Sequence, residues 1–249
     1  MNHPIFFVET KNVNENQAVL DKDESHHAIK VMRLSLGAQV VLVDGFGTAY
    51  RGEVAKLGRN NPVEILIHST LRKFGEPDAV VSLASGLSTN SKFDFVVEKA
   101  TELGVKRIIP LLTEKSKIKL DDPKRLKSKQ TRYEKIARSA IKQCRRSYIP
   151  EISLPVSFKD YLKEIDPNSL NLIFHPGKNA RGLASIDFSK NPQRVNIIIG
   201  PESGLSEAEI ELAKEKSIQA ITLGSRIMRT ETAGPVILGI IMNLLGELR

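Results

Sequence analysis

The chain has 249 residues, of which 41% are hydrophobic, and its formal net charge is +8 at pH 7. This length and apolar content suffice for one large or two modest cores. The single cysteine, Cys144, excludes an internal disulfide and any metal site built from several cysteines. The first twenty residues hold no continuous apolar run, and no stretch reaches the roughly 18 apolar residues that span a bilayer. We therefore expect a soluble, cytoplasmic protein without a membrane partner.

Residues 1–73 have the pattern of a small β-rich domain. Asp44-Gly45, followed by Gly47, predicts a hairpin between two strands. One short helix is expected from Ser25 to Arg33. Apolar or β-branched runs predict strands at Ile5–Val8, Val40–Val43, Tyr50–Val54 and Val63–Ile67.

The polar segment Arg72–Asp78 contains Gly and Pro and predicts a boundary, which divides the chain into domains 1–73 and 74–249. Beyond it, a strand at Ala79–Ser85, a helix capped by Ser91 and a strand at Arg107–Leu112 follow one another. Further apolar runs predict strands at Leu170–Phe174 and around Val195–Ile199. Strands that alternate with helices indicate an α/β fold, with a parallel sheet and helices on both of its faces.

Positive charge is concentrated between Lys115 and Arg146. This segment has thirteen Lys or Arg against three acids, a net charge of +10, which leaves about −2 of the total +8 for the rest of the chain. Such a cluster is typical of a polyanion-binding face, although charge runs also form ordinary solvated helix surfaces. Helical spacing in the same segment predicts one apolar face, made by Tyr133, Ile136, Ala137, Ala140, Ile141 and Cys144.

No metal site is expected. His26 and His27 are adjacent, so on a helix they point to different sides, and no acidic or cysteine partner stands at ligand spacing. The last helix carries Val236, Ile240 and Leu244 among many other apolar residues. This apolar stripe is wider than one core contact requires, which favours a homodimer interface on part of it.

Two stretches near the end of the chain, Ile197–Ser206 and Leu223–Gly234, each run from an apolar strand through a Gly-bearing loop into a helix. Ser206 with Glu209 forms a capping box for a helix around Ala208–Lys216, and a second helix opens near Thr232. We interpret the two strands as adjacent. Open α/β sheets bind ligands at the carboxyl ends of their strands, so the two loops predict a ligand crevice.

Together the two stretches resemble the cofactor loops of the SPOUT RNA methyltransferases, in particular the family that methylates N3 of a uridine in 16S ribosomal RNA. That family carries a Gly-Pro-Glu-Gly-Gly loop and a Leu-Gly-x-Arg-Ile-Leu-Arg-x-Glu-Thr-Ala segment. In this chain Ser203 replaces one of these glycines and Met228 replaces the leucine. Lys115 stands where the family usually has Arg, and Ile5 stands where it usually has an Arg before the first Phe.

The resemblance covers nearly the whole chain. It implies an N-terminal PUA-like RNA-binding β-barrel, a C-terminal α/β domain with a trefoil knot, and a homodimer through the C-terminal domain. It also implies S-adenosylmethionine as cofactor and the 16S rRNA or the small ribosomal subunit, at uridine 1498, as substrate. Residues alone would have predicted an unknotted sheet, because knots are very rare.

The resemblance also implies functional residues. The expected catalytic residues are Arg229 and Arg146, whose guanidinium groups would stabilise a uridinate as N3 loses its proton. His175 is either a general base or a loop residue beside the adenosine, and Glu202 or Glu231 either accepts the proton or serves in capping or pairing with Arg. The expected RNA contacts are Lys115, Lys117, Arg132, Arg138, Lys142 and Arg145. The expected cofactor contacts are Phe174, His175, Pro176, Gly200, Pro201, Glu202, Leu223, Gly224, Ile227, Met228 and Thr232.

Two other functions remain open from the residues. One is a SPOUT methyltransferase that acts on a ribose 2′-hydroxyl of transfer or ribosomal RNA. The other is a non-catalytic RNA-binding or ribosome-assembly protein, which would carry the same basic segment but would have no need of intact cofactor loops. A classical Rossmann methyltransferase is disfavoured, because no Gly-rich loop follows an early strand.

Overall fold

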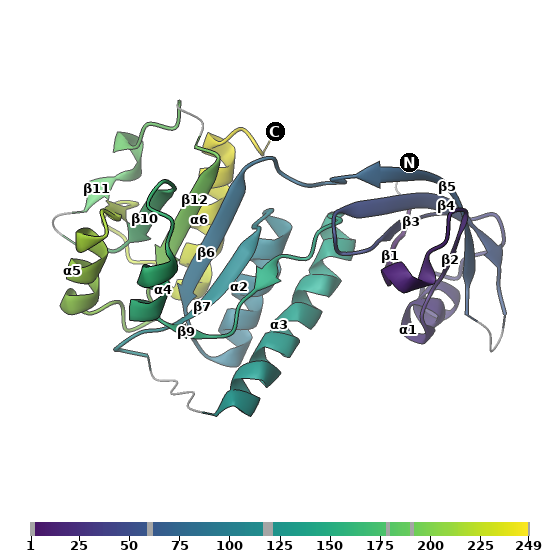
Figure 1. Cartoon of the computed structure of the whole chain (residues 1–249), viewed down its shortest axis with the longest axis horizontal. Helices are drawn as coiled ribbons and strands as arrows, with labels where there is room; N and C mark the ends of the chain where they lie inside the picture. Colours follow the sequence, from purple (N-terminus) through teal and green to yellow (C-terminus); the bar gives the residue numbers. More distant parts are fainter. Residues whose placement is uncertain (1–2, 59–61, 117–121, 178–179, 190–191, 249) are drawn as a thin grey trace. The chain divides into compact units, whose positions relative to one another are not determined.

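The computed structural model describes residues 3–58, 62–116, 122–177, 180–189 and 192–248 (Figure 1). The chain forms two compact units. The first consists of residues 1–76 together with 138–149, and the second of residues 77–137 and 150–249. The first unit therefore takes in a segment that lies more than sixty residues beyond the predicted boundary. Within the described residues, no helix is long and apolar enough to cross a bilayer.

The first unit is a curled five-stranded sheet in the order β1-β3-β4-β5-β2. Its core cluster centres on Phe6, Leu20, Leu42 and Ile65, which are all buried. The helix predicted at Ser25–Arg33 begins earlier, as α1 (Lys22–His26), and continues as a π-helical turn, η2 (His27–Val31). The strands are β1 (Ile5–Phe7), β2 (Gln17–Val19), β3 (Gln39–Val43), β4 (Thr48–Lys56) and β5 (Glu64–Arg72).

The end of helix α3 (Pro123–Cys144) belongs to this first unit. Ile141 packs with Phe7, Val41 and Val43 in a second apolar cluster of the unit. As predicted, Tyr133, Ala137, Ala140 and Ile141 form the buried face of α3, while Ile136 and Cys144 are half-buried.

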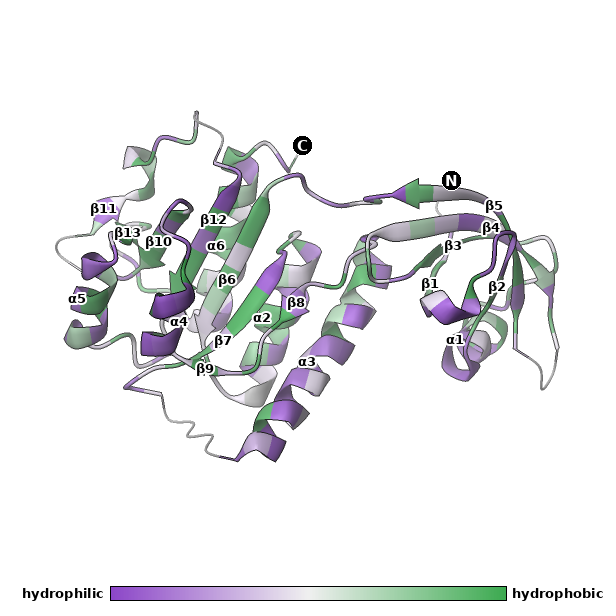
Figure 2. Ribbon diagram, viewed as in Figure 1, coloured by the Kyte–Doolittle hydropathy of each residue, from purple (hydrophilic) through white to green (hydrophobic). Residues whose placement is uncertain are grey.

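The second unit contains an eight-stranded sheet with the path β11-β13-β10-β12-β6-β7-β8, and β9 also pairs with β7. Every pairing in it is parallel. Figure 2 shows hydrophobic colouring over much of β6 and β7 and over the carboxyl end of β12, as a parallel sheet covered on both faces requires. The strands are β6 (Val80–Gly86), β7 (Arg107–Leu112), β8 (Glu151–Ile152), β9 (Val156–Ser157), β10 (Leu170–Phe174), β11 (Arg181–Gly182), β12 (Arg194–Ile199) and β13 (Gln219–Thr222).

Helices cover both faces of this sheet, because side chains alternate along each strand. On one face, Ile109, Ile173 and Ile198 pack in a cluster with residues of α4 (Phe158–Glu164) and α5 (Glu207–Glu215). On the other face, α2 (Asn90–Glu102) packs against α6 (Thr230–Leu244), and Leu83 of β6 lies close to Gly234 of α6. The predicted α/β class, with a parallel sheet in one unit and a small curled sheet in the other, is confirmed.

Two helix starts differ from the prediction for a local reason. Thr89, not Ser91, occupies the N-cap of α2, and α6 begins at Thr230 rather than near Thr232. Both helices begin two residues before the predicted position. Neither N-cap residue makes a side-chain capping bond, so no capping bond marks the true start of either helix. The predicted capping box of Ser206 and Glu209 is present at the start of α5.

Candidate active site

A cavity of about 510 Å³ lies at the carboxyl end of the parallel sheet. It is lined by the loops that follow β10, β12 and β13. These three strands are neighbours in the sheet and are labelled in Figure 2. The two Gly-bearing loops predicted from the sequence thus meet at one ligand crevice. Their strands are not adjacent, however, because β10 lies between β12 and β13 and contributes the loop of Phe174, His175 and Pro176.

The cavity suits a ligand with both an apolar and a polar part. Its inner wall includes the buried side chains of Ile199, Ile221 and Ile237, whereas Ile227 on the opposite loop is 82% exposed. Small-molecule sites typically have volumes of about 300–1,000 Å³, apolar walls and a few polar groups. The residues present therefore fit a nucleoside-type cofactor such as S-adenosylmethionine.

Gly86, at the end of β6, fixes the position of the Gly200-Pro201 loop. A Cβ atom at Gly86 would lie 2.2 Å from the backbone nitrogen of Pro201 and 2.7 Å from the carbonyl carbon of Gly200. On the other side, the buried Thr230 hydroxyl lies 3.5 Å from the Gly200 carbonyl oxygen. The loop therefore passes between β6 and the start of α6, an arrangement that the sequence motif alone did not reveal.

The loop after β7 also contributes to the cavity. Lys115 lines it, and the Lys115 ammonium donates to the Leu205 carbonyl at 3.0 Å. The hydroxyl of Ser203, which replaces a family glycine, donates to the Lys115 carbonyl at 2.7 Å. These two bonds join the loops after β7 and β12. Lys115, predicted to contact RNA, thus lies at the predicted cofactor site.

Glu202, in the loop after β12, and Glu231, in the first turn of α6, share one cation. Lys92 on α2 donates to Glu202 at 2.9 Å, and its ammonium lies 3.8 Å from the Glu231 carboxylate. The sequence predicted capping or pairing with Arg for these acids, and these two contacts are with a lysine.

Arg229 lies at the cavity and its side chain is exposed. Its main chain occupies the N-cap of α6, where the carbonyl accepts from the backbone nitrogens of Thr232 and Ala233. Arg226, which the sequence did not single out, also lines the cavity. Ten of the predicted cofactor residues line it as well, namely Phe174, His175, Pro176, Gly200, Pro201, Glu202, Leu223, Gly224, Ile227 and Met228. Thr232 does not, and the buried Thr230 stands nearer to the Gly200 loop.

Arg146 is not among the cavity residues. It belongs to the first unit, is buried, and donates to the Glu76 carboxylate at 2.8 Å. The structure thus gives this predicted catalytic arginine a structural contact inside its own unit.

The predicted RNA-contacting cations are largely matched by acids distant in sequence. Arg132 donates to Asp94 within the second unit, Arg138 to Asp21 within the first, and Lys142 to Glu24 within the first. Arg145 follows α3 with a φ of 66° and is half-buried. Lys117 lies outside the described residues.

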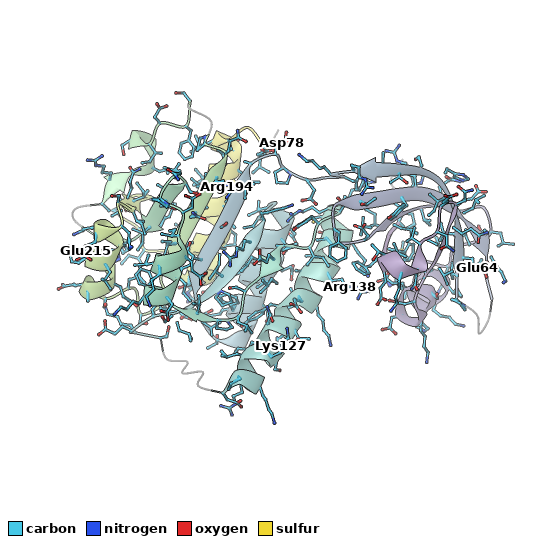
Figure 3. The ribbon with its side chains drawn as sticks, in the orientation of Figure 1. Glu64, Asp78, Lys127, Arg138, Arg194 and Glu215 are labelled. Atoms are coloured by element: carbon cyan, nitrogen blue, oxygen red, sulfur yellow. The ribbon has the colours of Figure 1, made fainter. Side chains whose placement is uncertain are left out.

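A groove on the second unit carries other cations. It lies between α2 and the first turns of α3, and Figure 3 labels Lys127 there, with its side chain projecting from the helix. Lys124, Lys127 and Lys135 line this groove together with Arg132, while Asp94 and Glu98 are its acidic members. Lys124, Lys127 and Lys135 are all exposed.

His175 provides a test of the cavity's electrostatics. Burial lowers the pKa of its imidazole below the ordinary value of about 6.5, and the nearby Lys115 cation lowers the pKa further. Adding a proton beside a positive charge costs energy, so the imidazole stays neutral to lower pH than a free histidine. We expect Lys115→Gln to raise the His175 pKa towards its ordinary value in an NMR titration. Lys163→Gln, on the surface of α4, should leave that pKa unchanged, and an equal shift in both variants would contradict the assignment.

Two family models match this chain. Residues 76–242 match the family model of an RNA methyltransferase domain, and residues 20–66 match that of an RNA methyltransferase PUA domain. The ribosomal RNA small subunit methyltransferase E of Mesomycoplasma hyopneumoniae is 34% identical over 232 residues, which cover 92% of this chain and 94% of that protein. This chain belongs to the ribosomal RNA small subunit methyltransferase E family. The Bacillus subtilis member is 31% identical over 216 residues, which cover 85% of this chain and 84% of that protein.

Solved structures of methyltransferases agree with the assignment to this methyltransferase family. The Neisseria gonorrhoeae ribosomal RNA small subunit methyltransferase E bound to S-adenosylmethionine has a TM-score of 0.86 and 26% identity, and the match covers 98% of both chains. A putative methyltransferase from Legionella pneumophila, solved with bound S-adenosylmethionine, has a TM-score of 0.86 and 28% identity, with the same coverage. The predicted family, the enzyme class and the PUA-type first domain are confirmed.

Proposed function

We propose that this chain transfers a methyl group from S-adenosylmethionine to N3 of one uridine in 16S rRNA, with uridine 1498 of the small subunit as the target. That it is a methyltransferase of ribosomal RNA follows from its family. The finer assignment is supported by the nearly intact Leu223–Gly234 motif and by one observation above all, the exposed Arg229 on a cavity fit for the cofactor.

The chemistry requires little beyond positioning and charge. When bound, S-adenosylmethionine supplies an electrophilic methyl group. Pro201, Ile227 and Met228 would cover the faces of its adenine, and the ten cavity residues predicted from the sequence would hold it. Holding donor and acceptor in line supplies a large part of the rate enhancement, because a bimolecular encounter becomes an intramolecular one.

Uridine N3 carries a proton at neutral pH and attacks only after that proton leaves. The Arg229 guanidinium donates to a uracil carbonyl oxygen and stabilises the negative charge that develops there. Two of the cavity's groups can accept the proton: the neutral His175 imidazole and the Glu202 carboxylate. The Glu202 carboxylate already accepts a hydrogen bond from Lys92, whereas burial keeps the His175 imidazole neutral, and this comparison favours His175.

RNA binding is proposed for both units. In the second unit, Arg132 and the exposed Lys124, Lys127 and Lys135 offer phosphate contacts along α3. Lys115, Arg138, Lys142 and Arg145 stay predicted contacts, and for Arg138 and Lys142 the phosphate would have to displace Asp21 and Glu24. Such contacts make the affinity fall steeply with salt.

A homodimer is proposed through α6. Val236, Ile240 and Leu244 are spaced four residues apart, so they share one helix face, and all three are exposed. Ile237, Leu238 and Ile241 occupy the buried face of the same helix. The exposed apolar face of α6 would be buried if it packed against the same face of a second copy of the chain. Sedimentation velocity should give a dimer, and a monomer at micromolar concentration would dismiss this interface.

The reaction is tested by mapping modified nucleotides. Unmodified 16S rRNA and small subunits, each incubated with the protein and S-adenosylmethionine, should gain one N3-methyluridine, detected by mass spectrometry of nuclease fragments. A ribose-methylated nucleotide would indicate the 2′-hydroxyl alternative. Cofactor binding without any transfer to either RNA substrate would favour the non-catalytic assembly protein.

A further inference from the structure

The hairpin between β3 and β4 displays an aromatic ring that no step of the proposed reaction uses. Phe46, between Gly45 and Gly47, is 75% exposed, although most of its neighbours in the hairpin are buried. A single exposed apolar residue is common on protein surfaces and carries no meaning by itself. The significance of Phe46 lies in how firmly its backbone is held and in what surrounds it.

The backbone on either side of Phe46 is fixed by hydrogen bonds. The buried Asp44 carboxylate accepts from the backbone nitrogens of Phe46 at 2.7 Å and Thr48 at 3.0 Å. Gly45 and Gly47 have φ values of 80° and 96°, which side chains rarely adopt. A Cβ at Gly45 would also lie 2.9 Å from the Ile149 side chain. The sequence around Phe46 is therefore specialised for this one conformation.

Two further segments of the first unit clamp the same loop. The Gly47 nitrogen donates to the Ser147 carbonyl at 2.9 Å, and the Ile149 nitrogen donates to the Gly45 carbonyl at 2.9 Å. From the end of β5, the Lys73 nitrogen donates to the Gly47 carbonyl at 2.8 Å. A ring presented on so rigid a support loses little conformational entropy when it binds a partner.

Two cations lie at the end of the strand that pairs with the hairpin. Arg72 and Lys73, at the end of β5, are both exposed, and Thr48 of the hairpin pairs with Arg72 in the sheet. The Arg72 guanidinium donates to the Thr48 hydroxyl at 2.7 Å. Because this hydroxyl is neutral, the contact does not compensate the positive charge of Arg72. An exposed aromatic face beside Arg and Lys is the arrangement with which proteins hold an unpaired nucleotide, the base on the ring and the phosphate on the cations.

We propose that Phe46 stacks on an unpaired base of the RNA substrate while Arg72 and Lys73 contact the adjoining phosphates. This inference rests on the proposed function, since it takes the bound macromolecule to be RNA. It assigns the first unit a contact with a single-stranded nucleotide, separate from the cavity in the second unit. The charge beside the ring favours this polyanion over an apolar pocket of another protein.

The chain contains no tryptophan, so Phe46→Trp places a sole indole at the proposed stacking position. The indole keeps a stacking surface and reports on it. We expect single-stranded 16S rRNA fragments to quench its fluorescence, and a fully paired RNA duplex of the same length to leave it unchanged. The matched control is Leu154→Trp, at a residue that is 46% exposed in the second unit and has no cation beside it in the sequence. Its fluorescence should not respond to either RNA.

The variant Phe46→Ala measures the contribution of the ring to binding. We expect the KM for 16S rRNA to rise roughly 5- to 150-fold, which corresponds to the usual loss of binding energy when one stacking aromatic residue is replaced by alanine. The kcat at saturating RNA and the affinity for S-adenosylmethionine should stay at the wild-type values, because the hairpin is no part of the cavity. Phe46→Tyr should restore the wild-type KM, which a mere change in loop conformation would not predict.

The outcomes separate this proposal from the proposed function. If wild-type protein methylates the RNA but Phe46→Ala has an unchanged KM and the Phe46→Trp indole is not quenched, base stacking is wrong and the methyltransferase assignment stands. Quenching by assembled subunits alone, and not by single-stranded RNA, would also overturn stacking, in favour of a ribosomal protein pocket. Failure of the wild-type protein to methylate any RNA would instead contradict the proposed function.

Discussion

Replacing Arg229 with alanine should lower the kcat for methylation by about 100- to 1,000-fold, the usual effect of removing one group that stabilises a developing oxyanion. The fold should survive, because the main chain of Arg229, not its side chain, caps α6. The affinity for S-adenosylmethionine, measured by calorimetry, should be unchanged, since the guanidinium is assigned to the uracil and not to the cofactor. The kcat is measured at saturating RNA, so that weaker RNA binding cannot imitate the loss.

Two further variants make the Arg229 experiment specific. Arg229→Lys keeps the charge but loses the planar pair of donors, so its kcat should lie between those of Arg229→Ala and the wild type. Arg194→Ala removes another exposed arginine of the second unit, at the opposite end of β12 from the cavity (Figure 3), and should be fully active. Full activity of Arg229→Ala, or loss of cofactor binding in it, would exclude the proposed role of the guanidinium.

The cofactor loops could be predicted from the sequence because each is contiguous along the chain. A run of branched apolar residues ending at Gly200-Pro201 specifies where the strand stops and the loop begins, and the capping box of Ser206 and Glu209 specifies where the next helix starts. Local rules of this kind need no knowledge of the rest of the fold. The residues around Phe174, Gly200 and Leu223 therefore line the cavity as predicted.

The remaining parts of the site depend on contacts between distant segments. Lys115 reaches the cavity because the loop after β7 bonds to that after β12, some ninety residues later. Gly86 approaches Gly200 only because β6 and β12 are neighbours in the sheet. The sequence marked Lys115 only as an RNA contact, and no motif pointed to Gly86. Strand order, which the sequence did not specify, determines both contacts and also places β10 between β12 and β13.

The basic segment shows the same limit for electrostatics. A count of charges between Lys115 and Arg146 predicts one continuous polyanion-binding face. In the fold, Asp21, Glu24 and Asp94, each far away in the sequence, come to lie against cations of α3. Such pairs form only through tertiary packing, so rules based on sequence spacing cannot predict them. Where they are exposed, they contribute little to stability. The exposed Lys124, Lys127 and Lys135 of α3 are the stronger phosphate-binding candidates.

Replacing Arg146 with methionine should destabilise the first unit by about 3–5 kcal/mol, the usual cost of removing one partner of a buried ion pair. The side chains of Arg146 and Glu76 are only 2% and 4% exposed, and two nitrogens of the guanidinium lie within 3.3 Å of one Glu76 oxygen. Methionine fills much of the space but leaves the buried carboxylate without its counter-charge. The other Glu76 oxygen keeps its bonds from the backbone nitrogens of Ser147 and Tyr148, so we expect the cost at the lower end of the range.

Hydrogen exchange followed by mass spectrometry can locate this effect, because the two units need not unfold together. In Arg146→Met, peptides of the first unit, including those around Tyr148, should lose protection while peptides of β10, β12 and β13 keep it. Arg125→Met, at an exposed position of α3, is the matched control and should behave as the wild type. Cofactor affinity should persist in both variants. Unchanged exchange in Arg146→Met together with loss of methylation would instead support the catalytic role that the sequence predicted for this arginine. Removal of a purely structural ion pair should always reduce the protection of the amides around it.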